Sequence, residues 1–264
     1  MLDLNHISKT FNRNTINEKN ALCDVDLHLK EGDYVTVIGG NGAGKSTMLN
    51  AVAGVWPVDE GDINLDGQNI TPLPEHRRAA FIGRVFQDPM MGTAPNMQLE
   101  ENLALAMRRG KPRGLRWGIT PKERQEYKDR LKTLGLGLED RMTAKVGLLS
   151  GGQRQALTLL MASLKKPKLL LLDEHTAALD PTTAAKVLEL SDRIIEENGL
   201  TAMMITHNMK DALRHGNRLI MMNEGQIILD IQGEEKKRMT KQELMELFAR
   251  AGAPMESDQV LLAK

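Results

Sequence analysis

The fold of this chain is decided by Gly39-Gly40-Asn41-Gly42-Ala43-Gly44-Lys45-Ser46-Thr47, which fits the phosphate-binding pattern G-x-x-x-x-G-K-[ST]. The β-branched run 34–38 before it predicts a buried strand, and residues 47–53 after it predict a helix. The glycines let backbone N–H groups converge on phosphates at the N-terminus of that helix. Lys45 is then expected to meet the β- and γ-phosphates of a nucleotide, and the Ser46 hydroxyl to ligate Mg²⁺. The alternative is a glycine-rich turn that binds nothing.

The size and charge of the chain narrow its class. It has 264 residues, and its 35 basic and 35 acidic side chains give a formal net charge of zero. This length is enough for one large α/β domain or a core with a smaller insert, and the balanced charge argues against nucleic-acid binding. The single Cys23 cannot form an internal disulfide, which favours a reducing compartment. With no secretory leader and no apolar run near the roughly 20 residues that cross a bilayer, we expect a soluble, cytoplasmic chain.

Apolar periodicity predicts the remaining elements. Alternating residues at the N-terminus favour an antiparallel β layer, and longer apolar runs favour core strands. The expected strands are 2–7, 25–29, 81–86, 168–174, 202–207 and a hairpin of 218–222 with 226–230, and residues 59–67 are expected to form a turn, a strand and a second turn. The expected helices are 100–108, 121–134, 153–164 and 241–251. The apolar stripe of the last helix is expected to pack against its own domain.

Polar residues end three of the predicted core strands, where ligands collect in open α/β sheets. Asp173 can hold a Mg²⁺ shell, and Glu174 can orient or deprotonate a water that attacks the γ-phosphate. Adjacent strand residues point to opposite faces, so the two acids are expected to do different jobs. His207 in this setting is a candidate γ-phosphate sensor. Gln87 either places an amide near the metal or the water, or is simply solvated.

A second potential phosphate cradle lies in Leu149-Ser150-Gly151-Gly152-Gln153. Ser150 is a plausible N-cap, and two glycines at a helix start expose N–H groups. Because one nucleotide already has its cradle, the second suggests a site shared between two chains. Asp180 is expected to cap the next helix. Phe11, beside a polar turn, is either an edge-packing residue or a platform for an adenine ring.

With these motifs, the chain resembles the ATP-binding subunit of ATP-binding-cassette (ABC) transporters over nearly its whole length. The phosphate loop is similar to the family's Walker A loop, Leu169–Glu174 to its Walker B strand, and Leu149–Gln153 to its signature sequence, which is the most specific match. The resemblance implies that Gln87 belongs to the Q-loop, Asp180 to the D-loop, His207 is the switch histidine and Phe11 the adenine-stacking aromatic.

The resemblance implies an α/β fold: a P-loop NTPase core with an antiparallel β layer and an inserted α-helical subdomain. The expected domains are 1–87 and 166–233 for the two parts of the core, 88–165 for the helical subdomain with the signature, and 234–264 for a C-terminal helix and tail. The site residues that it implies are Glu174, His207 and Gln87 for catalysis; Ser46, Gln87 and Asp173 for Mg²⁺; and Phe11, Gly39, Asn41, Gly42, Ala43, Gly44, Lys45, Ser46, Thr47, Ser150, Gly151, Gly152, Gln153 and Asp180 for ATP.

The implied function is that of an ATPase motor in a bacterial transporter, most simply an importer. Two subunits of this family pair head-to-tail, and each signature closes on the ATP held by the other chain. The implied partners are a second ATPase subunit, integral membrane permease subunits and, indirectly, an extracytoplasmic solute-binding protein, at the cytoplasmic face of the membrane. A soluble ABC ATPase that serves as an assembly scaffold is the alternative. Nucleic acid is not an expected partner.

Two features bear on the type of transporter. His175 stands where the family more often has Pro, which leaves the acids intact but can alter the following loop. The wording Asp173-Glu174-His175-Thr176-Ala177-Ala178 and Met91-Gly92-Thr93-Ala94 resembles a subgroup of importers that use lipoprotein binding proteins, some of which carry aromatic amino acids.

The insert between Gln87 and Ser150 is expected to contact the permease, since it is tethered at both ends to nucleotide-sensing groups. Met90, Met91, Met97 and Leu99 offer an adaptable apolar surface for that contact. The basic segment 108–117 is either a solvated loop or a contact with a partner or anionic lipid.

Overall fold

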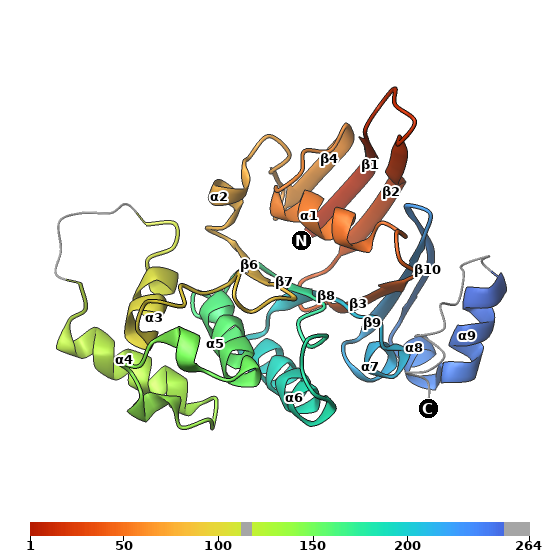
Figure 1. Ribbon diagram of the computed structural model, residues 1–264. Coiled ribbons are helices and arrows are strands. Elements are labelled where there is room, and N and C mark those ends of the chain that lie inside the picture. Colours follow the sequence, from red (N-terminus) through yellow and green to blue (C-terminus); the bar gives the residue numbers. More distant parts are fainter. Residues whose placement is uncertain (112–117, 251–264) are drawn as a thin grey trace. The chain divides into compact units, whose positions relative to one another are not determined.

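The computed structural model describes residues 1–111 and 118–250. Its contacts divide the chain into two units, Met1–Arg78 with Thr201–Lys264 and Ala79–Leu200 (Figure 1). The second unit is thus inserted in sequence between the two parts of the first. Residues 112–117 of the basic segment, and Ala251 of the predicted last helix, lie outside the described residues. Within the described part of the chain, every helix is too short or too polar to span a membrane.

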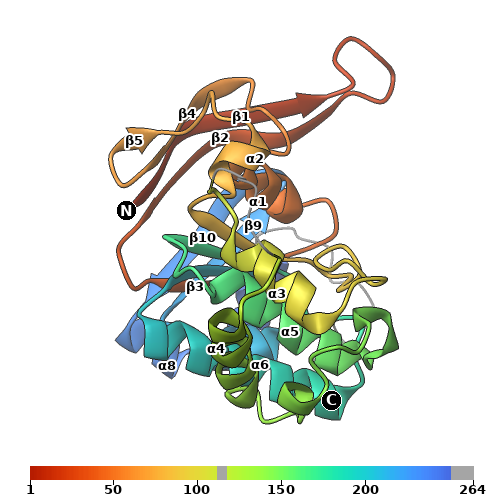
Figure 2. The ribbon, with the colours of Figure 1, turned by 90° about the vertical axis from the view of Figure 1, so that its left-hand side faces the viewer.

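An antiparallel sheet in the order β2-β1-β4-β5 forms the N-terminal layer of the first unit (Figure 2). Its strands are β1 (Leu2–Phe11), β2 (Lys19–Leu29), β4 (Glu60–Leu65) and β5 (Gln68–Asn69). β1 buries Leu2, Leu4 and then Ile7. A register shift between Leu4 and Ile7, where His6 has a φ of +52°, adds one residue and returns Ile7 to the buried face. The predicted antiparallel layer is confirmed, with β1 running beyond its expected end.

The first unit also contains strands in the order β10-β9-β3-β8. They are β3 (Tyr34–Gly39), β8 (Thr201–Ile205), β9 (Arg218–Asn223) and β10 (Gln226–Gln232). β3 is parallel to both β8 and β9, and every residue of β3 is buried. The predicted hairpin is confirmed: β9 turns into β10 at Glu224 and Gly225, whose φ values of +47° and +78° suit a two-residue hairpin turn.

Among the residues that the structure describes, five helices accompany these strands, and α8 and α9 close the core of the unit. They are α1 (Lys45–Ala53), α2 (Glu75–Arg78), α7 (Met209–Arg214), α8 (Glu234–Arg238) and α9 (Lys241–Arg250). Leu244 and Phe248 of α9 pack in one buried cluster with Met209, Ile38 and Leu219. The predicted packing of the last helix against its own domain is therefore confirmed.

The buried ammonium of Lys236 attaches α8 to the same core. Its side chain is 3% exposed, and Nζ donates to the carbonyl of Gly216 at 3.1 Å and to Thr36 Oγ1 at 3.3 Å. It also donates to the carbonyl of His215. Oxygen acceptors around a buried cation offset part of the cost of removing it from water.

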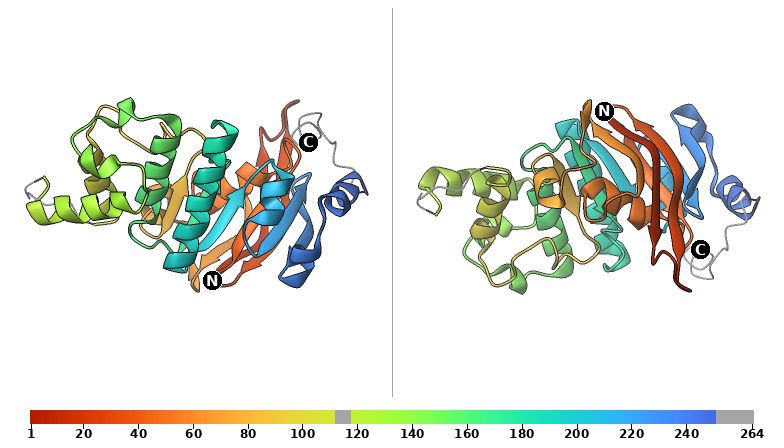
Figure 3. Two further views of the ribbon diagram at one scale, coloured as in Figure 1. Left: turned by 90° about the horizontal axis from the view of Figure 1, so that it is seen from below. Right: turned by 90° about the horizontal axis from the view of Figure 1, so that it is seen from above.

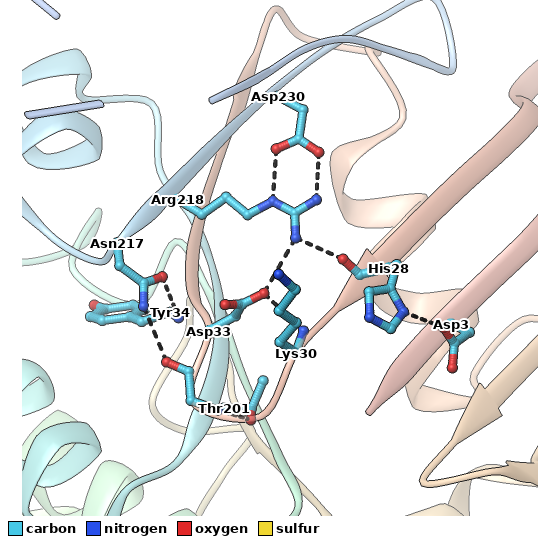
Figure 4. A network of polar contacts seen from close by, with 10 residues as sticks. Asp3, His28, Lys30, Asp33, Tyr34, Thr201, Asn217, Arg218 and Asp230 are labelled. Carbon is cyan, nitrogen blue, oxygen red and sulfur yellow. Dashed lines mark hydrogen bonds and ion pairs between the residues drawn. The ribbon is translucent and has the colours of Figure 1, made fainter. Parts of the chain in front are cut away.

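A polar network centred on Arg218 fixes the start of β3 (Figure 4). Nε of Arg218 donates to Asp230 on β10 at 2.7 Å, and Nη1 donates to the carbonyl of His28 at 2.7 Å and to Asp33 at 3.3 Å. The hydrogen bond with Asp230 raises the pKa of Arg218. Asn217 accepts from the N–H of Tyr34 at 3.0 Å. The connection from β2 to β3 is thus held to β9 and β10 before β3 leads into the glycine loop.

The second unit combines two parallel strands with helices, shown from opposite sides in Figure 3. Its elements are β6 (Ile82–Val85), β7 (Leu169–Asp173), α3 (Leu99–Met107), α4 (Pro121–Lys132), α5 (Gly151–Ser163), α6 (Pro181–Asn198) and the 3₁₀ turns η1 (Leu138–Asp140) and η2 (Val146–Leu148). A Cβ on Gly83 would lie 2.7 Å from the carbonyl of Ala162, so glycine lets α5 approach β6. Arg124 of α4 clamps the buried Glu100 of α3 with bonds of 2.6 and 2.8 Å.

The helices predicted in this region are confirmed, with shifts of one or two residues at their ends. One surface assignment is wrong. Leu99, expected to contribute to an exposed apolar surface, is fully buried because it opens α3 on the same inward side as Leu103. The mixed α/β class with an antiparallel layer agrees with the prediction.

Candidate functional site

The glycine loop connects β3 to α1 in a conformation that side chains would obstruct. A Cβ on Gly39 would lie 2.3 Å from the carbonyl oxygen of Met222. Gly44 has a φ of +102°, and a Cβ there would lie 2.5 Å from the carbonyl oxygen of Ala21. Both positions therefore require glycine, which keeps the loop backbone closely packed at the start of α1. A glycine loop before a helix can direct backbone N–H groups at an anion.

Lys45 lies over this loop. Its side chain is buried to 5% exposure, and Nζ donates to the carbonyls of Gly39 and Gly40 at 2.8 and 2.9 Å. The ammonium therefore lies beside the loop backbone. A phosphate bound by the loop N–H groups would be close enough for an attractive interaction with this charge. Ser46, the next residue of α1, is exposed and can present its hydroxyl to a metal ion.

His207 lies in the same unit as the glycine loop and at the same edge of its parallel strands. β3 is parallel to β8, and Val37 lies beside Ile205. The segments that follow the two strands therefore leave the sheet at the same edge. The strand ends at Ile205, two residues before the predicted end. The following Asn208 caps α7 through bonds from the N–H groups of Lys210 and Asp211, and this turn ends the strand earlier.

Phe11 ends β1 and has an aromatic neighbour that the sequence did not indicate. Trp56 approaches it edge-on, with ring centroids 4.9 Å apart and planes at 78°. The ammonium of Lys9 lies 5.6 Å from the centre of the Phe11 ring. Trp56 is 36% exposed, so part of its ring faces the solvent. No sequence spacing connects Phe11 with Trp56, which follows α1.

In the second unit, Gln87 follows β6, Asp173 is the last residue of β7, and Glu174 follows it. β6 and β7 pair in a register that places Val85 beside Leu172, so Gln87 and Glu174 leave the same edge. Gln87 is exposed, and Glu174 is half-buried with a φ of +46°. Few residues other than glycine adopt that conformation, so the surrounding loop must hold it.

Asp173 has a partner that sequence reasoning missed. Nη2 of Arg84, on β6, lies 3.3 Å from a carboxylate oxygen of Asp173, and both side chains are less than one-fifth exposed, at 14% and 17%. Arg84 also lies over the Phe86 ring, with its guanidinium carbon 4.5 Å from the ring centre. An arginine inside an otherwise apolar core strand was the signal. The pair keeps the Asp173 carboxylate in a cationic environment.

The second cradle begins α5 with the predicted cap. The Ser150 hydroxyl accepts from the N–H of Gln153 at 3.3 Å, and the Gln153 side chain accepts from the N–H of Ser150 at 3.2 Å. A Cβ on Gly152 would lie 2.2 Å from Cγ2 of Thr183 on α6. Glycine thus allows the start of α5 to pack against the start of α6.

Asp180 caps α6, as predicted, by accepting from the N–H of Thr183 at 3.1 Å. Hydrogen bonds from Thr183 hold the pKa of Asp180 below its usual value. The structure thus places the predicted site residues in two groups. Phe11, residues 39–47 and His207 belong to the first unit, and Gln87, residues 150–153, Asp173, Glu174 and Asp180 belong to the second.

Comparisons with known proteins give a consistent result. A family model described as ABC transporter matches residues 22–177. The tyrosine transport ATP-binding protein of Clostridioides difficile is 44% identical over 252 residues, which cover 95% of this chain and 100% of that protein. The spermidine/putrescine import ATP-binding protein of Mesoplasma florum is 33% identical over 86% of this chain and 60% of its own length. A solved dimeric ATP-binding cassette in a post-hydrolysis state, bound to ADP and Pi, is 31% identical, with a TM-score of 0.74 over 88% of this chain and 98% of that chain.

Proposed function

Since the chain belongs to the ABC transporter family and is an ATPase of its importer type, we propose that it powers the import of an aromatic amino acid, tyrosine first among them. The observation that carries this proposal is the 44% identity to a tyrosine transport protein over that protein's full length. The sequence motifs around His175 and after Gln87 also resemble the subgroup of importers that use lipoprotein binding proteins. The resemblance found in the sequence, and the fold that it implied, agree with this membership.

We propose that the two groups of site residues divide the work on ATP. The loop N–H groups and Lys45 would bind the phosphates, and Phe11 would stack on the adenine. Glu174 would orient or deprotonate the attacking water, and His207 would contact the γ-phosphate. The signature residues 150–153 and Asp180 would act on the ATP of a second subunit.

Mg²⁺ suits the proposed ligands. The Ser46 hydroxyl, the Gln87 amide and the Asp173 carboxylate all offer oxygen atoms, which are the ligands that Mg²⁺ prefers. When bound, the ion neutralises charge on the phosphate oxygens. Arg84 lies 3.3 Å from Asp173 and would orient that carboxylate for the ion.

Cassettes of this family dimerise, and importer ATPases of the family work with membrane permeases. We propose that this chain pairs with a second copy and binds a permease at the cytoplasmic face of the membrane, with a solute-binding protein on the other side. Exposed apolar side chains in the second unit support the permease contact. Met91 is 69% exposed and Leu148 is 71% exposed, and Met90 and Leu105 are also exposed.

The substrate proposal is tested by transport. The tagged chain would be purified with its copurifying membrane subunits and reconstituted in vesicles that contain ATP, and uptake of labelled tyrosine, phenylalanine, methionine and spermidine would be compared. We expect the solute-binding protein and ATP to stimulate uptake of tyrosine most strongly, and Glu174→Gln to abolish the stimulation. Stimulated uptake of spermidine or methionine alone would overturn the aromatic assignment.

The permease contact is tested by crosslinking. In a Cys23→Ser background, single cysteines at Met91 and Leu148 are expected to crosslink to a copurified membrane subunit, because both side chains are exposed on the proposed docking surface. Cysteines at Gln242 and Arg250, exposed on α9, are matched controls and should not crosslink. Crosslinks confined to α9 would place the contact elsewhere, and crosslinks at none of the four sites would favour the soluble scaffold.

A further inference from the structure

A histidine stands immediately beside the proposed water-activating glutamate, with its side chain inside the protein. His175 is 2% exposed, and Nε2 lies 2.9 Å from the hydroxyl of Ser191 on α6. Ser191 is itself fully buried, and its hydroxyl lies 2.8 Å from the carbonyl oxygen of Val187. A polar side chain placed this deeply is held by its hydrogen bonds.

One arrangement of protons satisfies both contacts of the Ser191 hydroxyl. A carbonyl oxygen only accepts, so the single hydroxyl proton of Ser191 goes to Val187. With the hydroxyl proton on that side, its oxygen accepts from Nε2 of His175, and this is the arrangement that satisfies both contacts. The imidazole is therefore a donor with one defined orientation toward α6.

This contact lies within a short loop whose backbone is otherwise unusual. Glu174 has a φ of +46°, in the left-handed region that side chains disfavour. The loop is closed by a bond from the N–H of Ala177 to the carbonyl of Glu174 at 2.9 Å, followed by one from Leu179 to Thr176 at 3.1 Å. Backbone conformations of this kind persist only where the surroundings hold them. The buried ring of His175 supplies such an anchor.

We propose that His175 is a positioning residue for ATP hydrolysis, which holds the Glu174 carboxylate in place by anchoring the adjacent backbone to Ser191 of α6. The proposal rests on the proposed role of Glu174. His175 would act without contacting nucleotide or water. It acts through its hydrogen bond to Ser191, which can be removed from either side.

The test uses purified full-length variants and measures kcat, the KM for ATP, nucleotide affinity and Tm. We expect His175→Leu to lower kcat by about 10- to 100-fold, the range associated with displacement of a reacting group by roughly 1 Å, while KM and nucleotide affinity change less than about twofold. His175→Gln, which retains an N–H donor at a similar reach, should recover most of the lost kcat. Ser191→Ala should lower kcat in the same direction, and the double variant His175→Leu/Ser191→Ala should be no slower than His175→Leu.

Ser163→Ala is the matched control. Ser163 is a buried helical serine on α5 whose hydroxyl also donates to a backbone carbonyl, that of Leu160 at 2.9 Å. It should keep the kcat of the unmodified protein. An unchanged kcat in His175→Leu, or fully additive effects of His175→Leu and Ser191→Ala, would overturn the proposal. If His175→Leu fails to fold, the milder Ser191→Ala decides by its own kcat. Full turnover in Glu174→Gln would instead overturn the role of Glu174 itself.

Discussion

A chain in which Glu174 is replaced by glutamine is expected to bind ATP normally and to hydrolyse it about 10²–10⁴ times more slowly. Glutamine has the same shape as glutamate and can occupy the same backbone conformation at the end of β7, but its amide cannot accept a proton from water. Steady-state phosphate release measures the turnover, and equilibrium dialysis with ATP measures the affinity. Glu196→Gln, which removes an equal charge from an exposed position of α6, should leave both unchanged.

Lys45→Ala, in contrast, is expected to weaken the binding of ATP. Nζ of Lys45 donates hydrogen bonds to two carbonyls of the glycine loop, and bound phosphates would lie beside it. Loss of a hydrogen bond to a charged group costs about 1.5–3 kcal/mol, which corresponds to a roughly 10- to 150-fold weaker affinity for ATP. If Glu174→Gln and Lys45→Ala weaken nucleotide binding equally, the proposed division between binding and chemistry is wrong.

The second large effect concerns dimerisation. With ATP and Mg²⁺, the Glu174→Gln protein is expected to form a dimer, because slow hydrolysis should hold the closed state. Adding Ser150→Arg should abolish that dimer and leave ATP binding by the monomer nearly normal, because a long cationic side chain would fill the proposed cradle for the partner's ATP. Light scattering with saturating ATP gives the mass directly.

Thr120→Arg provides the matched control for this substitution. Thr120 caps α4 in the same unit through the same reciprocal arrangement, with Glu123 in place of Gln153, and it is also exposed. Loss of either N-cap costs about 1 kcal/mol, so both variants lose similar helix stability. The dimer should survive Thr120→Arg. Its loss in both variants would mean that weakened capping, and not the cradle, explains the result. A Glu174→Gln protein that stays monomeric would contradict the shared site.

Local sequence patterns were sufficient to predict most strands and helices. They failed where contacts with residues far away in the sequence determine the structure. Apolar runs located β3 and β7 because a buried strand needs only its own side chains to be recognised. Alternation could not place the bulge in β1. The N–H of His6 bonds to Asp26 at 2.9 Å and its ring to Asp24 at 2.8 Å, both on β2, so the bulge depends on a strand some twenty residues away.

The site shows the same limit. The glycine loop and the caps at Ser150 and Asp180 were predictable because their chemistry is local in sequence. The contact of Arg84 with Asp173 joins residues 89 positions apart, and the bond of His175 to Ser191 crosses from a loop to the middle of a helix. No spacing rule connects such pairs, because packing of the strands and helices brings them together.

The buried ammonium of Lys236 has a practical consequence for where the polypeptide can be shortened. A shortened chain whose last residue is Gly233 would lack Lys236, whose ammonium donates hydrogen bonds to Thr36 on β3 and to Gly216 before β9. It would also expose Met209 and Leu219 to water by taking away Leu244 and Phe248. A loss of activity in such a shortened protein would therefore reflect damage to the fold of the first unit, and would be no evidence that the C-terminal helices regulate the ATPase. Reporter fusions and affinity tags therefore belong beyond Arg250.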